Sequence, residues 1–163
     1  MMNKIPENKT RKRLRLFLCF LYLLEIVLCT FPYYQVVQDG KLVTNSVFEV
    51  LSALGTGNTM GMASDQFSAV SRFLPMNFIF VIVPIVGFFF CALDKQSNMK
   101  NIVSILCCLV GVVSILTIVT VNLLSLGSML SLLLYILISF LSMLSIFARY
   151  SKPADNSVNP KET

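Results

Sequence analysis

The sequence predicts an all-α polytopic membrane protein: a bundle of four transmembrane helices with a small, partly structured extracytoplasmic loop. Hydrophobic residues make up 56% of the 163-residue chain, and its mean hydropathy is +0.78. These residues gather in four apolar stretches, at about residues 16–32, 77–93, 102–122 and 126–148. A membrane-spanning helix needs about 20 mostly apolar residues, so each stretch is a predicted span. The rest forms a basic tail (1–15), an outer loop (33–76), short joints and a polar tail (149–163), which leaves no separate soluble domain.

The positive charges predict the orientation of these spans. Eleven of the 13 Lys and Arg residues lie in the two tails or in the joint between the second and third spans, and only Lys41 and Arg72 lie elsewhere. Because positive residues stay on the cytoplasmic side, we expect a multi-pass plasma-membrane protein with both termini in the cytoplasm. The net charge of +5 is then explained by the topology. We expect the lipid bilayer to be the partner of these positive residues, and we expect no nucleic-acid partner.

The first span begins like a signal peptide, with a basic start and an apolar core. Thr30-Phe31-Pro32 provides no small-x-small cleavage site, so we expect an uncleaved anchor. The chain contains no Trp. Tyr33 and Tyr34 therefore are the predicted anchors at the outer membrane interface.

Glu25 is the one acid inside a predicted span. An ionisable residue at a helix centre costs about 3 kcal/mol on insertion scales, so its presence requires a reason. Tyr22 and Cys29 share its helix face, which predicts a narrow polar stripe toward the interior. Three interpretations remain open: a proton or cation site, a protonated carboxyl bonded to Ser or Thr of a neighbouring helix, and contact with a partner subunit.

The second and third spans carry features of helix packing. Pro84 and Gly87 predict a bend in the second span. In the third span, Cys107-x-x-x-Gly111 is a small-x-x-x-small pattern, and Ser114 continues the same face. Such a face lets helix backbones approach closely, within the chain or in a homo-oligomer.

The fourth span has a hydroxyl stripe along one face, at gaps of three and four residues. These residues are Ser128, Ser131, Tyr135, Ser139, Ser142 and Ser145. The stripe predicts helix packing, with Ser131 and Tyr135 at its contacts. Alternatively, Ser139 and Ser142 line a polar path with Glu25, which would also require an oligomer.

The outer loop contains a predicted β-hairpin and short helices. Two β-prone runs, residues 33–37 and 42–44, flank Asp39-Gly40, which favours a tight turn. Ser46-x-x-Glu49 is a capping-box pattern that opens a helix to about Leu54, and Gly55 is expected to end it. A second short helix is predicted from Ser64 or Asp65 to about Phe73.

No sequence motif predicts an enzyme, a cofactor or a metal site. The chain has no His, and its five cysteines lie in or beside apolar spans without a C-x-x-C pair. Because no spacing pairs the loop acids Asp39, Glu49 and Asp65, a lipid-modifying enzyme is only a third hypothesis.

The order of elements is similar to that of claudin-type tetraspans: inside termini, a long first outer loop and a very short second one. The outer loop here has no Cys and the chain has no Trp. The resemblance therefore implies helix order alone.

These features predict a non-enzymatic accessory or structural membrane protein, which acts through helix association with a membrane-protein partner or with copies of itself. The alternative is a small oligomeric channel or transporter that uses Glu25 and the hydroxyl stripe of the fourth span.

Overall fold

The computed structural model describes residues 9–38, 40–56, 68, 74–94, 99–119 and 123–150. This part of the chain is mostly helical and contains five helices and three short strands. The helices are α1 (Lys9–Leu28), α2 (Val47–Thr56), α4 (Leu74–Leu93), α5 (Met99–Val119) and α6 (Leu126–Tyr150). The strands are β1 (Tyr34–Gln38), β2 (Lys41–Asn45) and β3 (Leu123–Leu124).

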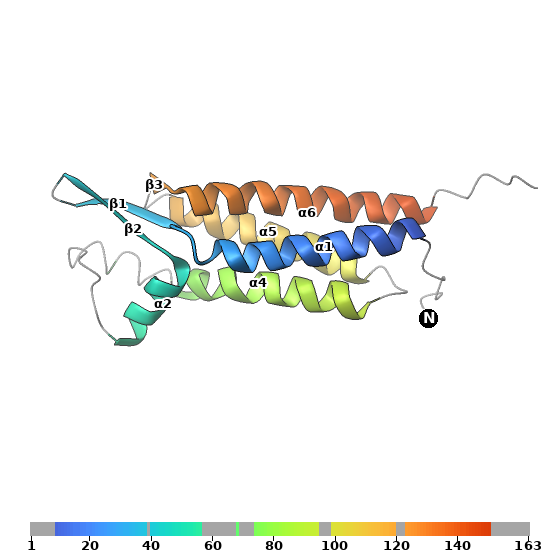
Figure 1. Cartoon of the computed structure of the whole chain (residues 1–163), viewed down its shortest axis with the longest axis horizontal. Coiled ribbons are helices and arrows are strands. Elements are labelled where there is room, and N and C mark those ends of the chain that lie inside the picture. Colours follow the sequence, from blue (N-terminus) through green and yellow to red (C-terminus); the bar gives the residue numbers. More distant parts are fainter. Residues whose placement is uncertain are drawn as a thin grey trace, which may run out of the picture.

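The four long helices lie side by side and form what we call the helical body (Figure 1). α1 packs against α4, α4 against α5, α5 against α6, and α6 again against α1. The strands and α2 form a cap at one end of this body. Lys9 and Tyr150, the two ends of the described helices, lie at the opposite end (Figure 1).

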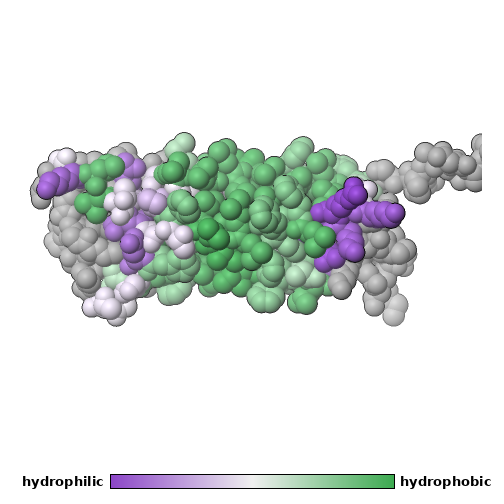
Figure 2. All heavy atoms as spheres, viewed as in Figure 1, coloured by the Kyte–Doolittle hydropathy of each residue, from purple (hydrophilic) through white to green (hydrophobic). Residues whose placement is uncertain are grey.

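The helical body has a largely apolar surface around an interior in which apolar and polar side chains are mixed. Figure 2 shows a broad apolar band across its middle, with hydrophilic groups toward both ends. The band includes large residues of all four helices that are about half exposed, such as Phe20, Ile82, Val113 and Phe140. The interior holds Glu25 and several serines that are almost completely buried. A completely buried Glu is rare in water-soluble domains unless it is paired.

Two of the helices are long and apolar enough to cross a membrane, by length and composition: α5 over Met99–Thr117 and α6 over Leu126–Ala148. The apolar part of α4, Asn77–Leu93, is shorter. α1 begins with a run of basic residues and carries Glu25, which reduces its apolar length.

The helices extend beyond the predicted spans at the end of the body that holds the termini. α1 begins at Lys9, inside the predicted tail, because Lys, Arg and Leu all favour helix and no Gly or Pro interrupts them. α6 continues to Tyr150.

α4 starts at Leu74, so Pro75 lies in its first turn, where the missing N–H is tolerated. The helix then continues through Pro84.

The predicted hairpin is confirmed, and it gains a third strand. β1 and β2 pair antiparallel, with Tyr34 opposite Asn45 and Gln38 opposite Lys41. Gly40 adopts a φ of 73°, a left-handed conformation that glycine tolerates without steric cost. β3, which was predicted only as a joint between spans, pairs with the other edge of β1, so the sheet order is β2-β1-β3.

The predicted capping box at the start of α2 is also confirmed. The Glu49 backbone N–H donates to Ser46 Oγ at 3.2 Å, and the Ser46 N–H donates to Glu49 Oε2 at 2.7 Å. The expected stop at Gly55 was wrong, since α2 runs to Thr56 without requiring a positive φ at that glycine. Apart from Ser68, the predicted second short helix lies outside the described residues.

We expect Ser46→Ala to destabilise α2 locally by about 1 kcal/mol, the usual cost of losing an N-cap. Hydrogen exchange of the α2 amides measures this effect as faster exchange. Ser52→Ala is the matched control, because Ser52 is exposed in the interior of the same helix, away from its N-cap. Equal exchange in the two variants would contradict the role of Ser46.

Candidate functional site

The interior of the helical body contains two groups of polar side chains. The Tyr22 cluster consists of Tyr22, Cys91, Ser104 and Cys108. Ser104 Oγ lies 2.6 Å from the Tyr22 hydroxyl and 3.8 Å from Cys91 Sγ. Cys108 Sγ lies 4.0 Å from the same hydroxyl. Tyr22 thus connects α1 to α5 and satisfies its own buried hydroxyl.

The Glu25 cluster lies on the cap side of the Tyr22 cluster and consists of Glu25, Tyr33, Ser131 and Tyr135. All four side chains are at most 2% exposed. Among the described residues, neither Glu25 oxygen and none of the three hydroxyls has a hydrogen-bond partner. The Tyr135 hydroxyl nevertheless lies beside the Glu25 carboxyl. The Tyr33 hydroxyl lies near Ser131 and Glu25.

Three segments bring the Glu25 cluster together. Glu25 comes from α1, Ser131 and Tyr135 lie one turn apart on α6, and Tyr33 lies between α1 and β1. The chain turns after Leu28, and the Gly127 N–H donates to the Pro32 carbonyl at 2.9 Å, which ties this turn to the start of α6. The Tyr33 ring then packs on Phe80 with ring centres 4.8 Å apart.

Cys29 closes the cluster on the α4 side. Its thiol donates to the Phe80 carbonyl at 3.4 Å and to the Glu25 backbone carbonyl at 3.5 Å. The predicted polar stripe of Tyr22, Glu25 and Cys29 is therefore buried as a unit. The Glu25 carboxyl makes no hydrogen bond to Ser or Thr within the described residues. Its complete burial also leaves no surface for a partner subunit.

Glycine allows the tyrosines to enter the interior. A Cβ at Gly111 would lie 2.6 Å from the Tyr135 ring, and a Cβ at Gly87 would overlap the Tyr22 ring. Gly111 and Ser114 are buried, and Cys107 is half-buried. The close approach predicted for Gly111 is thus used within this chain, between α5 and α6.

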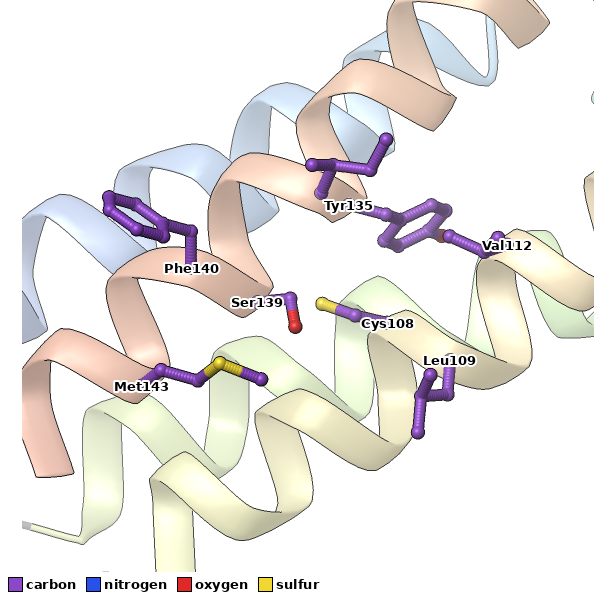
Figure 3. A pocket seen from close by; sticks show the side chains of 8 residues that line it. Cys108, Leu109, Val112, Tyr135, Ser139, Phe140 and Met143 are labelled. Atoms are coloured by element: carbon purple, nitrogen blue, oxygen red, sulfur yellow. The ribbon is translucent and has the colours of Figure 1, made fainter.

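The structure separates the two other predicted site residues from Glu25. Ser139 and Ser142 lie one and two turns past Tyr135 on α6, away from the cap. Ser142 is buried without a hydrogen-bond partner in the described part of the chain. Ser139 is half-buried and lines a cavity of about 350 Å³ between α5 and α6. There the side chains of Ser139 and Cys108 point toward one another (Figure 3).

A second groove, of about 330 Å³, lies between α1 and α6. It is lined entirely by leucines: Leu24, Leu28, Leu130, Leu133, Leu134 and Leu137. Neither groove presents a charged group. Both are suited to an apolar neighbour such as an acyl chain or another helix.

Two residues expected at the membrane interface are instead part of the interior. Tyr33 and Tyr34 are 2% and 1% exposed, because they lie at the base of the hairpin and contact Phe80 and Asn77 of α4. The Tyr34 hydroxyl donates to Asn77 Oδ1 of α4, and burial raises the pKa of both phenols. The alternation of residues along β1 did not predict this burial, because a local pattern cannot show which other element packs against the strand.

Hydrogen bonds join α4 to α5 at the end of the helical body away from the cap, and the sequence did not predict them. The Lys100 backbone N–H donates to Asp94 Oδ2 at 2.9 Å, and Lys100 Nζ donates to the Asp94 carbonyl at 3.0 Å. Arg15 Nη1 donates to the Ala92 carbonyl at 3.3 Å and so connects α1 to the same end of α4. In the sequence, the short separation between Asp94 and Lys100 could have indicated these hydrogen bonds.

The described residues contain no group of three Cys, Asp or Glu side chains suited to a metal ion. Glu49 is engaged in the α2 cap, while Asp39 and Asp65 lie outside the described residues. Comparison with protein-family models, curated proteins and solved structures found no match to this chain.

Proposed function

We propose that this chain is a multi-pass protein of the plasma membrane, with α1, α4, α5 and α6 as a four-helix transmembrane bundle. The broad apolar band on the surface (Figure 2), with Glu25 and several serines buried inside, is the observation that carries this proposal. Water would penalise so much exposed apolar surface, whereas hydrocarbon does not. α4, with 20 residues, is about 30 Å long at 1.5 Å per residue and matches the hydrocarbon thickness.

α1 completes the bundle as the fourth span. Its exposed residues from Leu16 onward are apolar, and Glu25 is hidden inside. Its basic first turns would lie at the headgroups, where Lys and Arg reach water and anionic lipid. The basic residues at the start of α1 lie at the end of the helical body away from the cap, where Figure 2 shows hydrophilic side chains. Both termini are therefore proposed to be cytoplasmic and the cap extracytoplasmic.

Labelling from outside the cell tests this orientation. We expect a membrane-impermeant maleimide to label Leu42→Cys, because Leu42 is 56% exposed in the hairpin. Lys12→Cys, on the exposed face of α1, should be labelled only after permeabilisation. The unsubstituted protein is the control for its five native cysteines. Labelling of Lys12→Cys in intact cells would overturn the orientation.

Within that membrane, the proposed role is that of a non-enzymatic accessory or structural subunit. Within the described residues, the interior carries polar contacts between helices but no paired acid and base. The small residues Gly111, Ser114 and Ser131 face inward, so a partner would meet the outer surface instead. The α5–α6 cavity, with the half-buried Ser139, is a hollow in that surface.

Purification from native membranes in mild detergent, followed by mass spectrometry, tests the accessory role. We expect a stoichiometric foreign subunit. Ser139→Leu should fill the cavity and release the subunit, while Met129→Leu, on the exposed face of the same helix, should retain it. A homo-oligomer without foreign subunits would contradict the accessory role.

The second candidate is a small oligomeric channel or transporter, and the buried Glu25 without a hydrogen-bond partner is the observation that favours it. Intramembrane acids are costly and often mark ion pathways. This candidate predicts flux in liposomes that Glu25→Gln abolishes and that Met129→Leu, on the exposed face of α6, preserves. Equal flux in both variants would eliminate the role of Glu25.

A further inference from the structure

We propose that the Glu25 cluster binds one monovalent alkali cation, coordinated by oxygens of Glu25, Tyr33, Ser131 and Tyr135. Such a site would join α1, α6 and the turn below the cap through one ion. The proposal concerns binding and does not depend on either proposed function.

The first argument is the number of unbonded oxygens in one buried place. The two Glu25 carboxyl oxygens and the hydroxyls of Tyr33, Ser131 and Tyr135 are all buried without a hydrogen-bond partner in the described residues. Buried polar atoms are normally satisfied. Five unbonded oxygens on neighbouring side chains therefore indicate that these oxygens share a ligand.

The second argument is their arrangement. Tyr135 lies beside Glu25, and Tyr33 lies beside Ser131, close enough for a weak electrostatic interaction, but neither contact has the distance and angles of a full hydrogen bond. Oxygens that coordinate a common ion behave in this way, because the ion lies between them. The positions of the two phenols are also constrained, Tyr33 by Phe80 and Tyr135 by Gly111.

Charge and chemistry determine the class of ion. The site has one carboxylate, and among the described residues the buried cations Arg11, Arg15 and Lys100 belong to the other end of the helical body. A monovalent cation neutralises one carboxylate, whereas a divalent ion would leave a buried positive charge, which is costly in low dielectric. Carboxylate and hydroxyl oxygens are hard ligands, which suit alkali ions rather than soft metals.

Thermal unfolding of the detergent-purified full chain tests the site. NaCl or KCl is compared with choline chloride at equal ionic strength and fixed pH. At about 100 times the Kd, a bound cation should raise the Tm by about 5–10 °C. Tyr135→Phe and Ser131→Ala each remove one oxygen and should reduce the shift. Glu25→Gln removes the charge and should abolish it.

Ser142→Ala is the matched control, because it removes another buried, unbonded hydroxyl of α6 outside the cluster and should retain the full shift. The proposal is overturned if the Tm is the same in choline, sodium and potassium salts, which would leave only internal water or a bound proton. A larger shift with CaCl₂ than with either alkali salt would also overturn it. If Glu25→Gln fails to fold, Tyr135→Phe and Ser131→Ala still decide the outcome.

Discussion

Gly87→Ala and Gly111→Ala should each lower the free energy of unfolding by about 1–3 kcal/mol, the usual cost of overpacking a core. A Cβ at Gly87 would overlap the Tyr22 ring, and a Cβ at Gly111 would lie 2.6 Å from the Tyr135 ring. Neither ring can move away easily, since both tyrosines have 0% exposure. Tyr22 is also held by its contact with Ser104.

Gly55→Ala is the matched control for these substitutions. A Cβ at Gly55 meets no atom within 4 Å, so the same change there should be neutral or slightly stabilising. Chemical unfolding in mixed micelles measures all three variants. Shortening the opposing ring with Tyr22→Leu should offset part of the loss in Gly87→Ala, because residues in contact are not additive. Equal stability of Gly55→Ala and Gly111→Ala would contradict the packing described for α5 and α6.

Alkaline pH should destabilise the protein through the two phenols under the cap. Burial raises the pKa of Tyr33 and of Tyr34 well above the ordinary value of about 10. Below pH 10 the folded and unfolded states both keep these protons, so stability is unaffected. Above pH 10 only the unfolded state loses them, and the free energy of unfolding should fall by about 1.4 kcal/mol per pH unit for each phenol.

Unfolding between pH 9.5 and 11.5 measures this slope, and Tyr33→Phe and Tyr34→Phe should each remove one contribution to it. Lysine deprotonation affects both variants equally and does not obscure the difference. Tyr34→Phe should also lower stability at neutral pH, because the buried hydrogen bond from Tyr34 to Asn77 Oδ1 is lost. Tyr33→Phe removes no hydrogen bond within the described residues. Slopes identical to that of the unsubstituted chain would show that these phenols are accessible.

Local patterns determined most of the secondary structure. The apolar runs predicted α4, α5 and α6, because apolar helices of this length are encoded by consecutive residues. Asp39-Gly40 predicted the hairpin, and Ser46 with Glu49 predicted the start of α2, since turns and caps depend on neighbours within a few positions. The extension of α1 through its basic residues was missed because charge was interpreted as topology alone.

Only the tertiary structure decided what those elements enclose. The sequence placed Glu25 in an apolar helix, but Tyr33 joins it only because the chain turns after Leu28 and the turn docks on Gly127. β3 forms only because the edge of β1 lies beside it. The small-x-x-x-small pattern at Gly111 predicted that a neighbouring element packs closely against it. Whether that neighbour belonged to the same chain or to another copy depended on long-range packing, which no local spacing encodes, and in this structure it is Tyr135.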